Sequence, residues 1–377
     1  MKSFLLMMVA IYGGVHVYLF LRVKSLFSFS FAATLTVSAY MAVMVVSPIL
    51  VRFLEREGWE WGARLCAWVG YTWMGFVFVT FILCLMGDLL SLALLVVKAA
   101  GIKGLYISPR FLTALSLVMG LIICVYGIYE AQDIQTSVLT IKTFRIPRHV
   151  GPVRIVQISD VHLGVMVRRE RLSMILKEVK AASPDILVST GDLVDGTMDS
   201  LEELSDLFRE ITPRYGKFAV TGNHEFYAGI DQATNFIEKA GFRLLRGESV
   251  TVAGSIVIAG VDDPAGRRFG GKETASERDL FLQSPGFRIL LKHQPRVIDI
   301  AGEGFNLQLS GHTHRGQIVP FNWITSLVYP YLAGRFDLGK ERLLYVCRGS
   351  GTWGPPMRVL APPEIVVVNL VPAGDEV

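Results

Sequence analysis

Long apolar stretches dominate the first third of the chain. They run from Phe4 to Leu21, Phe31 to Leu54, Leu65 to about Leu85 and Phe111 to Tyr129. Each approaches the roughly 20 residues that an α-helix needs to cross a hydrocarbon core about 30 Å thick. Arg and Lys fill the gaps, and tryptophans gather near the third stretch, as is typical of a membrane–water boundary. The pattern predicts a membrane domain of about four transmembrane helices over residues 1–131.

Three parts of this region have a second interpretation. The first stretch could be a signal peptide, but it lacks a small-residue cleavage site and three more spans follow, which favours an uncleaved helix. Asp88 lies between the third stretch and another apolar segment, and we expect it at the interface rather than as a proton carrier. Leu89 to Val97 would then form at most an interfacial helix. Core helices of a soluble protein rarely reach this length and uniformity.

From Lys142 onward, short strand-like runs alternate with amphipathic segments. The runs VRIVQIS, DILVST and GKFAV are separated by RERLSMILKEVKAA and LEELSDLFREI. This alternation predicts an α/β domain that is large enough to bury its own core. We place the domain at residues 151–377 and expect residues 132–150, which include Pro147, to form a linker.

Composition and charge narrow the class of protein. Apolar residues make up 51% of the 377 residues, and the formal net charge is only +4. This agrees with a membrane-embedded portion, and without a clustered basic stripe we expect no nucleic-acid partner. Four cysteines occur without a Cys-x-x-Cys pair, so we expect buried thiols rather than disulfides or a thiolate metal site. The sequence leaves the oligomeric state open.

Polar residues of metal-binding type follow five of the strand-like runs. They are Asp160 and His162, then Asp192, then Asn223 and His224, then His293, and finally His312 and His314. Ligand sites of open α/β sheets gather at the carboxyl ends of strands, so we expect these side chains in one crevice. Any one of them alone could be a turn residue or a satisfied core histidine. Their recurrence at five strand ends favours a shared site.

Oxygen and imidazole donors without thiolates suit manganese, iron or zinc. The donors are too many for one tetrahedral ion, and they fit two ions that share a carboxylate. Such a pair clamps the attacking and leaving oxygens of phosphoryl transfer and acidifies a bound water. The expected reaction is therefore attack of hydroxide on phosphorus.

The motifs DVH, GDLVDG, GNHE, KHQP and GHTH, in this order, resemble those of the calcineurin-like metallophosphoesterases. The resemblance covers about Val153 to Leu370. The tail GSGTWGPPMRVLAPPEIVVVNL is similar to that of the bacterial membrane-associated branch, which acts on phosphodiesters. The resemblance implies a two-sheet β-sandwich flanked by helices, with metals at the strand ends.

The resemblance also implies a role for each residue of the motifs. Two divalent ions are expected, manganese first, with iron or zinc as alternatives. The bridging ligand would be Asp192, and His224 would donate a proton to the leaving oxygen. The remaining ligands would be Asp160, His162 and His314 for the first ion, and Asn223, His293 and His312 for the second.

One residue departs from the pattern. Many members of this branch carry glycine after GHTH, whereas this chain has Arg315. A guanidinium there could hold a phosphate oxygen, or it could point to solvent or pair with a surface acid. Four other arginines are candidates for binding an anionic head group, although solvated loop charges are the favoured interpretation: Arg168, Arg169, Arg267 and Arg268.

Two apolar features near the motifs have two interpretations each. The segment PFNWITSLVYPYLAGRF, residues 320–336, is expected to be a packed connection between strands, with contact to lipid chains as the alternative. Trp353 could stack on a base or sugar of the substrate, or pack on its glycine-rich turn.

The function expected from these observations is a membrane-anchored, dinuclear-metal phosphoesterase that cleaves a phosphodiester or pyrophosphate. A lipid-linked substrate such as UDP-diacylglucosamine is the sharpest version, by family analogy. The alternatives are an enzyme for soluble nucleotides or phosphoproteins, or a non-catalytic receptor or assembly factor with a vestigial domain. A small excess of Lys and Arg on one side of the spans predicts a catalytic domain on the cytoplasmic side of the inner membrane.

Overall fold

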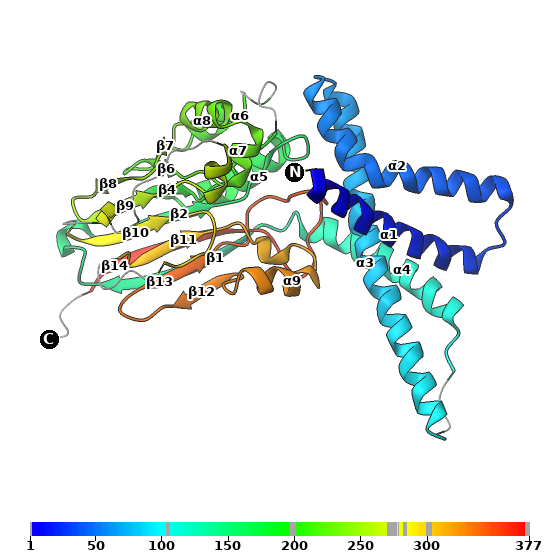
Figure 1. Ribbon diagram of the computed structural model, residues 1–377. Helices are drawn as coiled ribbons and strands as arrows, with labels where there is room; N and C mark the ends of the chain where they lie inside the picture. Colours follow the sequence, from blue (N-terminus) through cyan, green and yellow to red (C-terminus); the bar gives the residue numbers. More distant parts are fainter. Residues whose placement is uncertain are drawn as a thin grey trace. The chain divides into compact units, whose positions relative to one another are not determined.

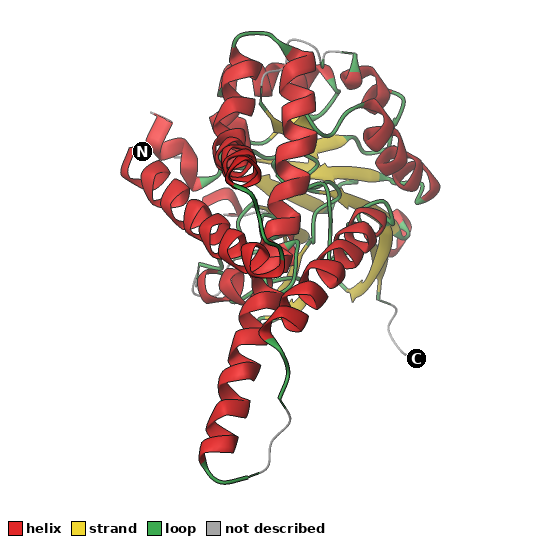
Figure 2. Cartoon of the chain, turned by 90° about the vertical axis from the view of Figure 1, so that its right-hand side faces the viewer, coloured by secondary structure: helices red, strands yellow, loops and turns green. Residues whose placement is uncertain are grey.

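The chain forms two compact units in the computed structural model. The first contains Met1–Tyr129 with Gly354–Met357, and the second contains Glu130–Trp353 with Arg358–Val377. The first is helical, and all strands of the described chain belong to the second (Figures 1 and 2). The structure describes residues 2–102, 106–196, 201, 203–269, 277, 279–281, 285–298 and 304–373.

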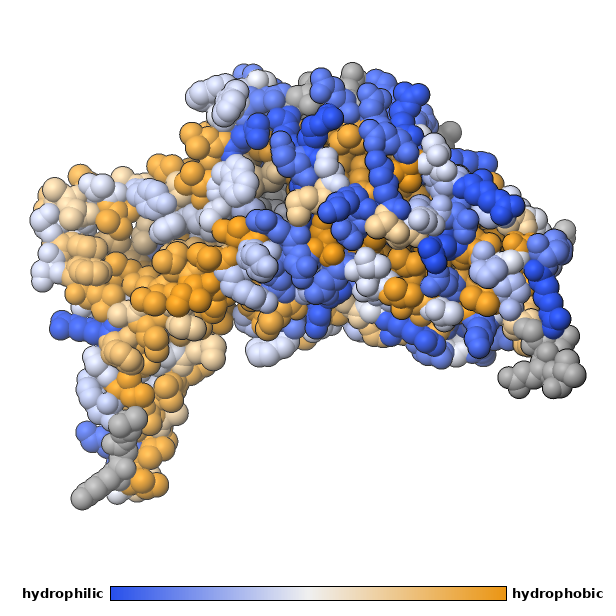
Figure 3. Space-filling model, turned by 180° about the vertical axis from the view of Figure 1, so that it is seen from behind, coloured by the Kyte–Doolittle hydropathy of each residue, from blue (hydrophilic) through white to orange (hydrophobic). Residues whose placement is uncertain are grey.

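The helical unit confirms the four expected apolar helices. They are α1 (Lys2–Leu26), α2 (Phe31–Arg56), α3 (Glu60–Ala99) and α4 (Pro109–Glu130). All four are long and apolar enough to cross a membrane, and the face of this unit in Figure 3 is mostly hydrophobic. The separate interfacial helix expected at 89–97 is wrong, because these residues continue α3. The segment contains no proline or glycine that would end the helix.

Small and polar side chains join the helices of this unit. Asp88 of α3 forms an ion pair with Arg22 of α1 and accepts a hydrogen bond of 2.7 Å from the hydroxyl of Tyr18. The carboxylate of Asp88 therefore has partners on a neighbouring helix, as a charge in an apolar helix requires. A Cβ atom on Gly70 would collide with Ser47 of α2, so the absence of a side chain permits close packing there.

The second unit contains two six-stranded mixed sheets, which confirms the predicted two-sheet sandwich. The first sheet has the order β1 (Gln135–Thr143), β14 (Glu364–Pro372), β2 (Val153–Ile158), β4 (Ile186–Ser189), β6 (Lys217–Ala219) and β7 (Arg243–Leu244). The second has the order β12 (Gly334–Asp337), β13 (Leu343–Val346), β11 (Leu307–Ser310), β10 (Phe287–Leu291), β9 (Ile256–Gly260) and β8 (Glu248–Val252). A two-stranded sheet joins β3 (Leu163–Gly164) to β5 (Val194–Asp195).

Helices cover the outer face of the first sheet. They include α5 (Arg169–Ala181), α6 (Leu204–Arg209) and α8 (Ile230–Lys239), whereas α7 (Asn223–Ala228) follows β6 directly. Short 3₁₀ turns are η1 (Arg148–Val150), η2 (Pro264–Phe269), η3 (Asp279–Phe281) and η4 (His314–Gly316).

The strands of the first sheet are buried on both faces. In β2, Ile155 packs into the core between the sheets, whereas Val156 packs into the core under the helices, against residues such as Leu172 of α5. Strands buried on both faces are apolar at nearly every position, which explains the uninterrupted runs in the sequence. The two cores fix the first sheet between the helices and the second sheet.

Residues 132–150 are not the expected linker. Nine of them form β1, which pairs in parallel with β14 from Gln135 opposite Glu364 to Thr143 opposite Pro372. Only one face of this edge strand is apolar, and its partner strand lies more than 200 residues away in the sequence. A local pattern therefore cannot reveal the pairing.

The segment 320–336, which was expected to be a packed connection between strands, also differs from its prediction. Residues Phe321–Val328 form the helix α9, and none of its side chains is buried. The packed interpretation is therefore wrong for this part of the segment. The strand β12 follows it.

We predict that Leu139→Ala lowers the free energy of unfolding by about 2–5 kcal/mol, because it removes a side chain from the core between the sheets. The neighbour Val138 is 64% exposed, so Val138→Ala is the matched control and should stay within about 0.5 kcal/mol. Denaturant titration of the full chain in detergent measures both changes. Equal effects at the two positions would contradict the placement of β1.

Candidate metal centre

The side chains that the sequence predicted lie at the carboxyl ends of strands from both sheets. Strands β2, β4 and β6 run parallel in the first sheet, and β10 and β11 run parallel in the second. Each of the five is followed within four residues by one or two of the predicted side chains. The arrangement explains why chain segments far apart in sequence deliver their polar residues to one place.

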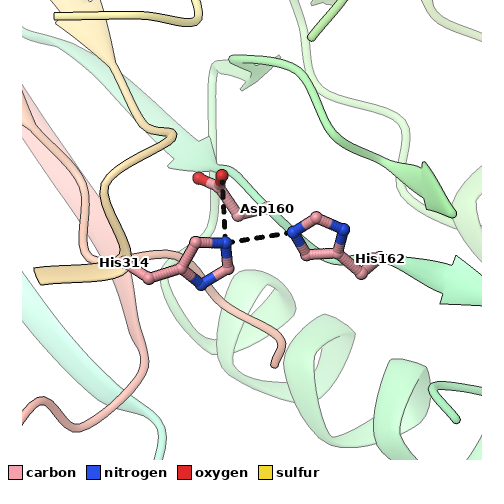
Figure 4. Close-up of side chains that lie close together, drawn as sticks. All are labelled: Asp160, His162 and His314. Carbon is pink, nitrogen blue, oxygen red and sulfur yellow. Dashed lines mark hydrogen bonds and ion pairs between the residues drawn. The ribbon is translucent and has the colours of Figure 1, made fainter. Parts of the chain in front are cut away.

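One group contains Asp160, His162 and His314 (Figure 4). The Nε2 atom of His314 is 3.0 Å from Nε2 of His162 and 3.4 Å from Oδ1 of Asp160. All three residues are buried. Three potential ligand atoms therefore converge on one point.

A second group contains Asp192, His293 and His312. The Nε2 atom of His293 is 3.1 Å from Oδ2 of Asp192 and 3.1 Å from Nδ1 of His312. The same Asp192 oxygen is 3.9 Å from Nε2 of His162 in the first group. The carboxylate of Asp192 therefore faces both groups.

The residues fit divalent ions. The Oδ1 atom of Asn223 is buried and lacks a hydrogen-bond partner within the described part of the chain, so a cation would satisfy it. His293 directs Nδ1 at the carbonyl oxygen of Thr190, at 2.8 Å. A carbonyl only accepts, so Nδ1 carries the proton and Nε2 is left to bind an ion. Carboxylate, amide and imidazole donors suit manganese, iron or zinc.

The backbone at this centre adopts a conformation that is rare outside glycine. Five of the predicted ligands have left-handed φ angles: Asp160 (52°), His162 (56°), Asp192 (51°), His312 (73°) and His314 (48°). Each such residue costs about 1–3 kcal/mol, and residues of this kind gather at functional sites. These turns direct the five side chains into the centre. If the strands continued in an extended conformation, the same side chains would point elsewhere.

Two glycines allow the closest approaches. A Cβ atom on Gly222 would collide with the carboxylate of Asp192, and one on Gly311 would collide with Ser159 and Asp160. The motifs GNHE and GHTH therefore need glycine at their first position for steric reasons.

His224 is bonded to two acidic residues. Its Nδ1 is 2.9 Å from Oδ1 of Asp195, and its backbone N–H donates to Oδ1 of Asp192 at 2.9 Å. Burial alone would lower the pKa of His224, but the charges of Asp192 and Asp195 outweigh it and raise the pKa to about 9. The imidazole therefore holds a proton near neutral pH. Sequence reasoning did not single out Asp195, although it lies in GDLVDG, three residues after Asp192.

Glu225 was also missed, although it follows His224 in GNHE. Its fully buried carboxylate accepts backbone hydrogen bonds from Gly222 at 2.6 Å and from Asp192 at 3.0 Å. It accepts two more from Leu193 at 2.7 Å and Val194 at 3.2 Å. One side chain thus holds together the loops that carry Asp192 and Asn223.

Two further residues hold the histidines of GHTH. The hydroxyl of Tyr329 is 2.8 Å from Nε2 of His312. The guanidinium of Arg358 is fully buried, donates to the carbonyl oxygen of His314 at 3.2 Å and lies 3.1 Å from Nδ1 of that residue. Nothing local in the sequence marks these two contacts, since Tyr329 lies in the apolar segment 320–336 and Arg358 lies in the tail after GHTH.

The predicted anion-binding arginines lie outside the two groups. Arg315 is exposed on η4, directly after His314, and its role in substrate binding stays a prediction. Arg168 and Arg169 lie at the start of α5, and Arg267 and Arg268 lie in η2. The charge of Arg268 acts on Tyr227, whose ring is 5.4 Å from that of His224.

Trp353 borders the centre on the side of His224. The two ring centroids are 5.7 Å apart, and the indole is 51% exposed. Its backbone exchanges hydrogen bonds with the side chain of Gln317, at 2.8 and 3.0 Å. The residue therefore packs on its turn and also presents an aromatic face beside His224.

Comparison with known proteins assigns the family. The model for calcineurin-like phosphoesterases matches residues 153–316. A metallophosphoesterase of Aquifex aeolicus, described as uncharacterized, is 40% identical over 253 residues, which are 66% of this chain and 97% of that protein. The chain therefore belongs to the calcineurin-like metallophosphoesterase family, and it is a metal-dependent phosphoesterase.

Relatives with membrane spans extend the similarity. A transmembrane protein with metallophosphoesterase domain from Danio rerio is 30% identical over 310 residues, covering 78% of this chain and 71% of its own. One from Bos taurus is 29% identical over 358 residues, covering 89% and 80%. Residues 130–377 are 248 of the 377, so this second match includes part of the helical unit. The chain is a membrane protein.

We predict that Glu225→Gln lowers the metal content of the purified protein, because an amide nitrogen would face backbone donors that the carboxylate now satisfies. The loss of charged hydrogen bonds should lower the free energy of unfolding by roughly 1.5–3 kcal/mol. Elemental analysis and denaturant titration measure the two effects.

The matched control is Glu210→Gln. Glu210 is exposed and pairs with Lys180 at the surface, so its loss should change stability by at most about 1 kcal/mol and leave the metal content intact. The same metal content and stability in both variants would contradict the role of Glu225.

Proposed function

We propose that the chain is a dinuclear-metal phosphoesterase. Asp160, His162 and His314 would hold the first ion. Asn223, His293 and His312 would hold the second, with Asp192 between them. The observation that carries the proposal is the position of Asp192, whose Oδ2 lies 3.1 Å from His293 and 3.9 Å from His162. A carboxylate that faces two groups of nitrogen donors is suited to bridge two cations.

Divalent ions, when bound there, would supply the positive charge that activates water and stabilises the phosphoryl oxygens. We expect manganese, with iron or zinc as alternatives. The Oδ1 atom of Asn223 has no hydrogen-bond partner among the described residues, and Nε2 of His293 faces Asp192 and His312 at 3.1 Å each. Both observations support binding of oxygen- and nitrogen-ligated ions of this kind.

His224 would act as the general acid. Its contact with Asp195 fixes the ring and leaves Nε2–H free to donate to the oxygen of the leaving group. The hydrogen-bonded carboxylate of Asp195 favours the protonated form of the imidazole. An alkoxide leaving group needs such a proton, because it departs poorly as an anion.

The substrate we propose is a phosphodiester or pyrophosphate that is linked to a lipid, of the kind represented by UDP-diacylglucosamine. The four apolar helices support it, because they bring the domain to a bilayer. The exposed aromatic rings of Trp353 and Tyr227 beside His224 support an amphiphilic ligand. Arg315 would bind a phosphate oxygen. We place the protein in the inner membrane, with the catalytic domain on the cytoplasmic side.

Removal of metal should abolish activity. After treatment with a chelator, hydrolysis of bis-p-nitrophenyl phosphate should stop, and added manganese should restore it. Elemental analysis of the active protein should find close to two ions per chain, and about one after His293→Ala, because that substitution removes a ligand of the second ion only. The exposed His149 offers the control, since His149→Ala should keep both ions. Full activity in metal-free protein would overturn the proposal.

The role of His224 can be separated from metal binding. His224→Ala should lower kcat about 10²–10⁴-fold for an alkyl phosphodiester, because the leaving oxygen then lacks its proton donor. The metal content should stay unchanged. The loss should be much smaller with bis-p-nitrophenyl phosphate, whose leaving group needs little protonation, and kinetics on both substrates check this. A loss of the same size on the two substrates would exclude His224 as the acid.

A further inference from the structure

The helix α9 presents an apolar surface to the outside of the domain. Trp323 is 70% exposed, Ile324 55%, Leu327 85% and Val328 60%. The chain has no charged residue from Gly316 through Gly334. Adjacent exposed side chains of this size mark a surface that another apolar phase covers.

The two hydroxyl groups of α9 form hydrogen bonds within the helix. The hydroxyl of Thr325 donates to the carbonyl oxygen of Phe321 at 3.1 Å, and that of Ser326 donates to Trp323 at 2.8 Å. When hydroxyls are hydrogen-bonded within their own helix, moving the helix out of water costs little free energy for these groups. These contacts allow α9 to enter an apolar phase without unpaired hydroxyls.

The short connection between α4 and β1 indicates which apolar phase lies near α9. The helix α4 ends at Glu130, and β1 begins at Gln135. Five residue steps span less than about 20 Å even when fully extended. If α4 crosses a bilayer, the phosphoesterase domain stays at the surface of that bilayer. The lipid surface is then the apolar phase at the highest local concentration.

The charges around α9 fit a lipid surface as well. Arg315 precedes the uncharged segment and Arg335 follows it, and both are exposed. Arg296 is also exposed, with its guanidinium 5.4 Å from the ring of Tyr329 at the end of α9. Apolar side chains flanked by arginines are typical of a helix that lies in the interfacial plane of a membrane, where the cations meet anionic head groups.

We propose that α9 is a second membrane contact of this protein, which inserts Trp323, Ile324, Leu327 and Val328 into the interfacial region of the bilayer. The helix ends at Val328, and the hydroxyl of the next residue, Tyr329, contacts the ring of His312 at 2.8 Å. The contact therefore places head groups beside the candidate metal centre. The proposal deepens the proposed function, because it gives the site direct access to lipid-linked phosphoesters, but the insertion itself does not depend on catalysis.

The test uses the full chain in vesicles of phosphatidylcholine and phosphatidylglycerol. Leu327→Cys carries an environment-sensitive fluorophore, and lipids with a nitroxide on the acyl chain serve as the quencher. The fluorophore at 327 should lose about half of its emission or more, as expected for a side chain buried 5–10 Å into the head-group boundary. Labelled wild-type protein gives the background from the native cysteines, of which Cys66 is half-buried and the other three are buried.

The matched control is Phe144→Cys. Phe144 is 76% exposed and lies in the same domain, one residue after β1. Its label should respond to iodide in the aqueous phase and not to the lipid quencher. A label at 327 that behaves in the same way would overturn the proposal. So would a label at 327 that neither quencher reaches, because another protein surface would then cover α9.

Hydrolysis of bis-p-nitrophenyl phosphate with manganese, in the same vesicles, shows that each variant is folded. Lipid quenching at 327 in a protein that lacks this activity, wild type included, would contradict the proposed function and leave the membrane contact standing. Activity without lipid quenching at 327 would contradict the membrane contact and leave the proposed function standing. The two hypotheses therefore fail separately.

Discussion

The phosphoesterase domain is organised around the crowding of lone-pair donors at one edge of its two sheets. Two imidazole nitrogens, from His162 and His314, lie 3.0 Å apart, and the buried carboxylates of Asp160 and Asp192 flank them. Burial and the charge of Asp192 raise the pKa of Asp160. The raised pKa shows that two negative charges at this buried position are unfavourable. Cations relieve this repulsion, so metal binding and folding of the domain are coupled.

The surrounding structure can be understood as the means of holding that arrangement. Left-handed backbone conformations at five residues oppose it by roughly 5–15 kcal/mol in total, and two buried charged side chains counter them. Glu225 fastens the loops after β4 and β6 through four backbone hydrogen bonds. Arg358 fastens the loop after β11 through the carbonyl oxygen of His314. Both are buried where they can act on backbone, so their contribution is to position ligands rather than to contact substrate.

The sequence predicted the features that depend on residues close together in the chain, and it did not predict those that depend on contacts between distant segments. The strands, the residues after them and the two-sheet fold were predictable, because buried strands are apolar throughout and GDLVDG, GNHE and GHTH stand at their ends. Asp195 and Glu225 were within reach, inside motifs that were already singled out. The contacts of Tyr329 and Arg358 and the pairing of β1 were not, since each of them joins residues from separate segments of the sequence. The exposure of α9 was equally hidden, because an apolar helix and an apolar core strand have similar composition.

The short connection after α4 affects how the active site meets its substrate. A freely diffusing phosphoesterase must find its substrate in three dimensions, and a soluble substrate would gain nothing from a tether of five residue steps. A substrate confined to the same bilayer is always within reach, so binding is limited by the orientation of the domain rather than by encounter. A contact between α9 and the bilayer would fix the orientation of the domain. Because Tyr329 directly follows α9, that orientation would bring His312 and the candidate metal centre to the level of the phosphates.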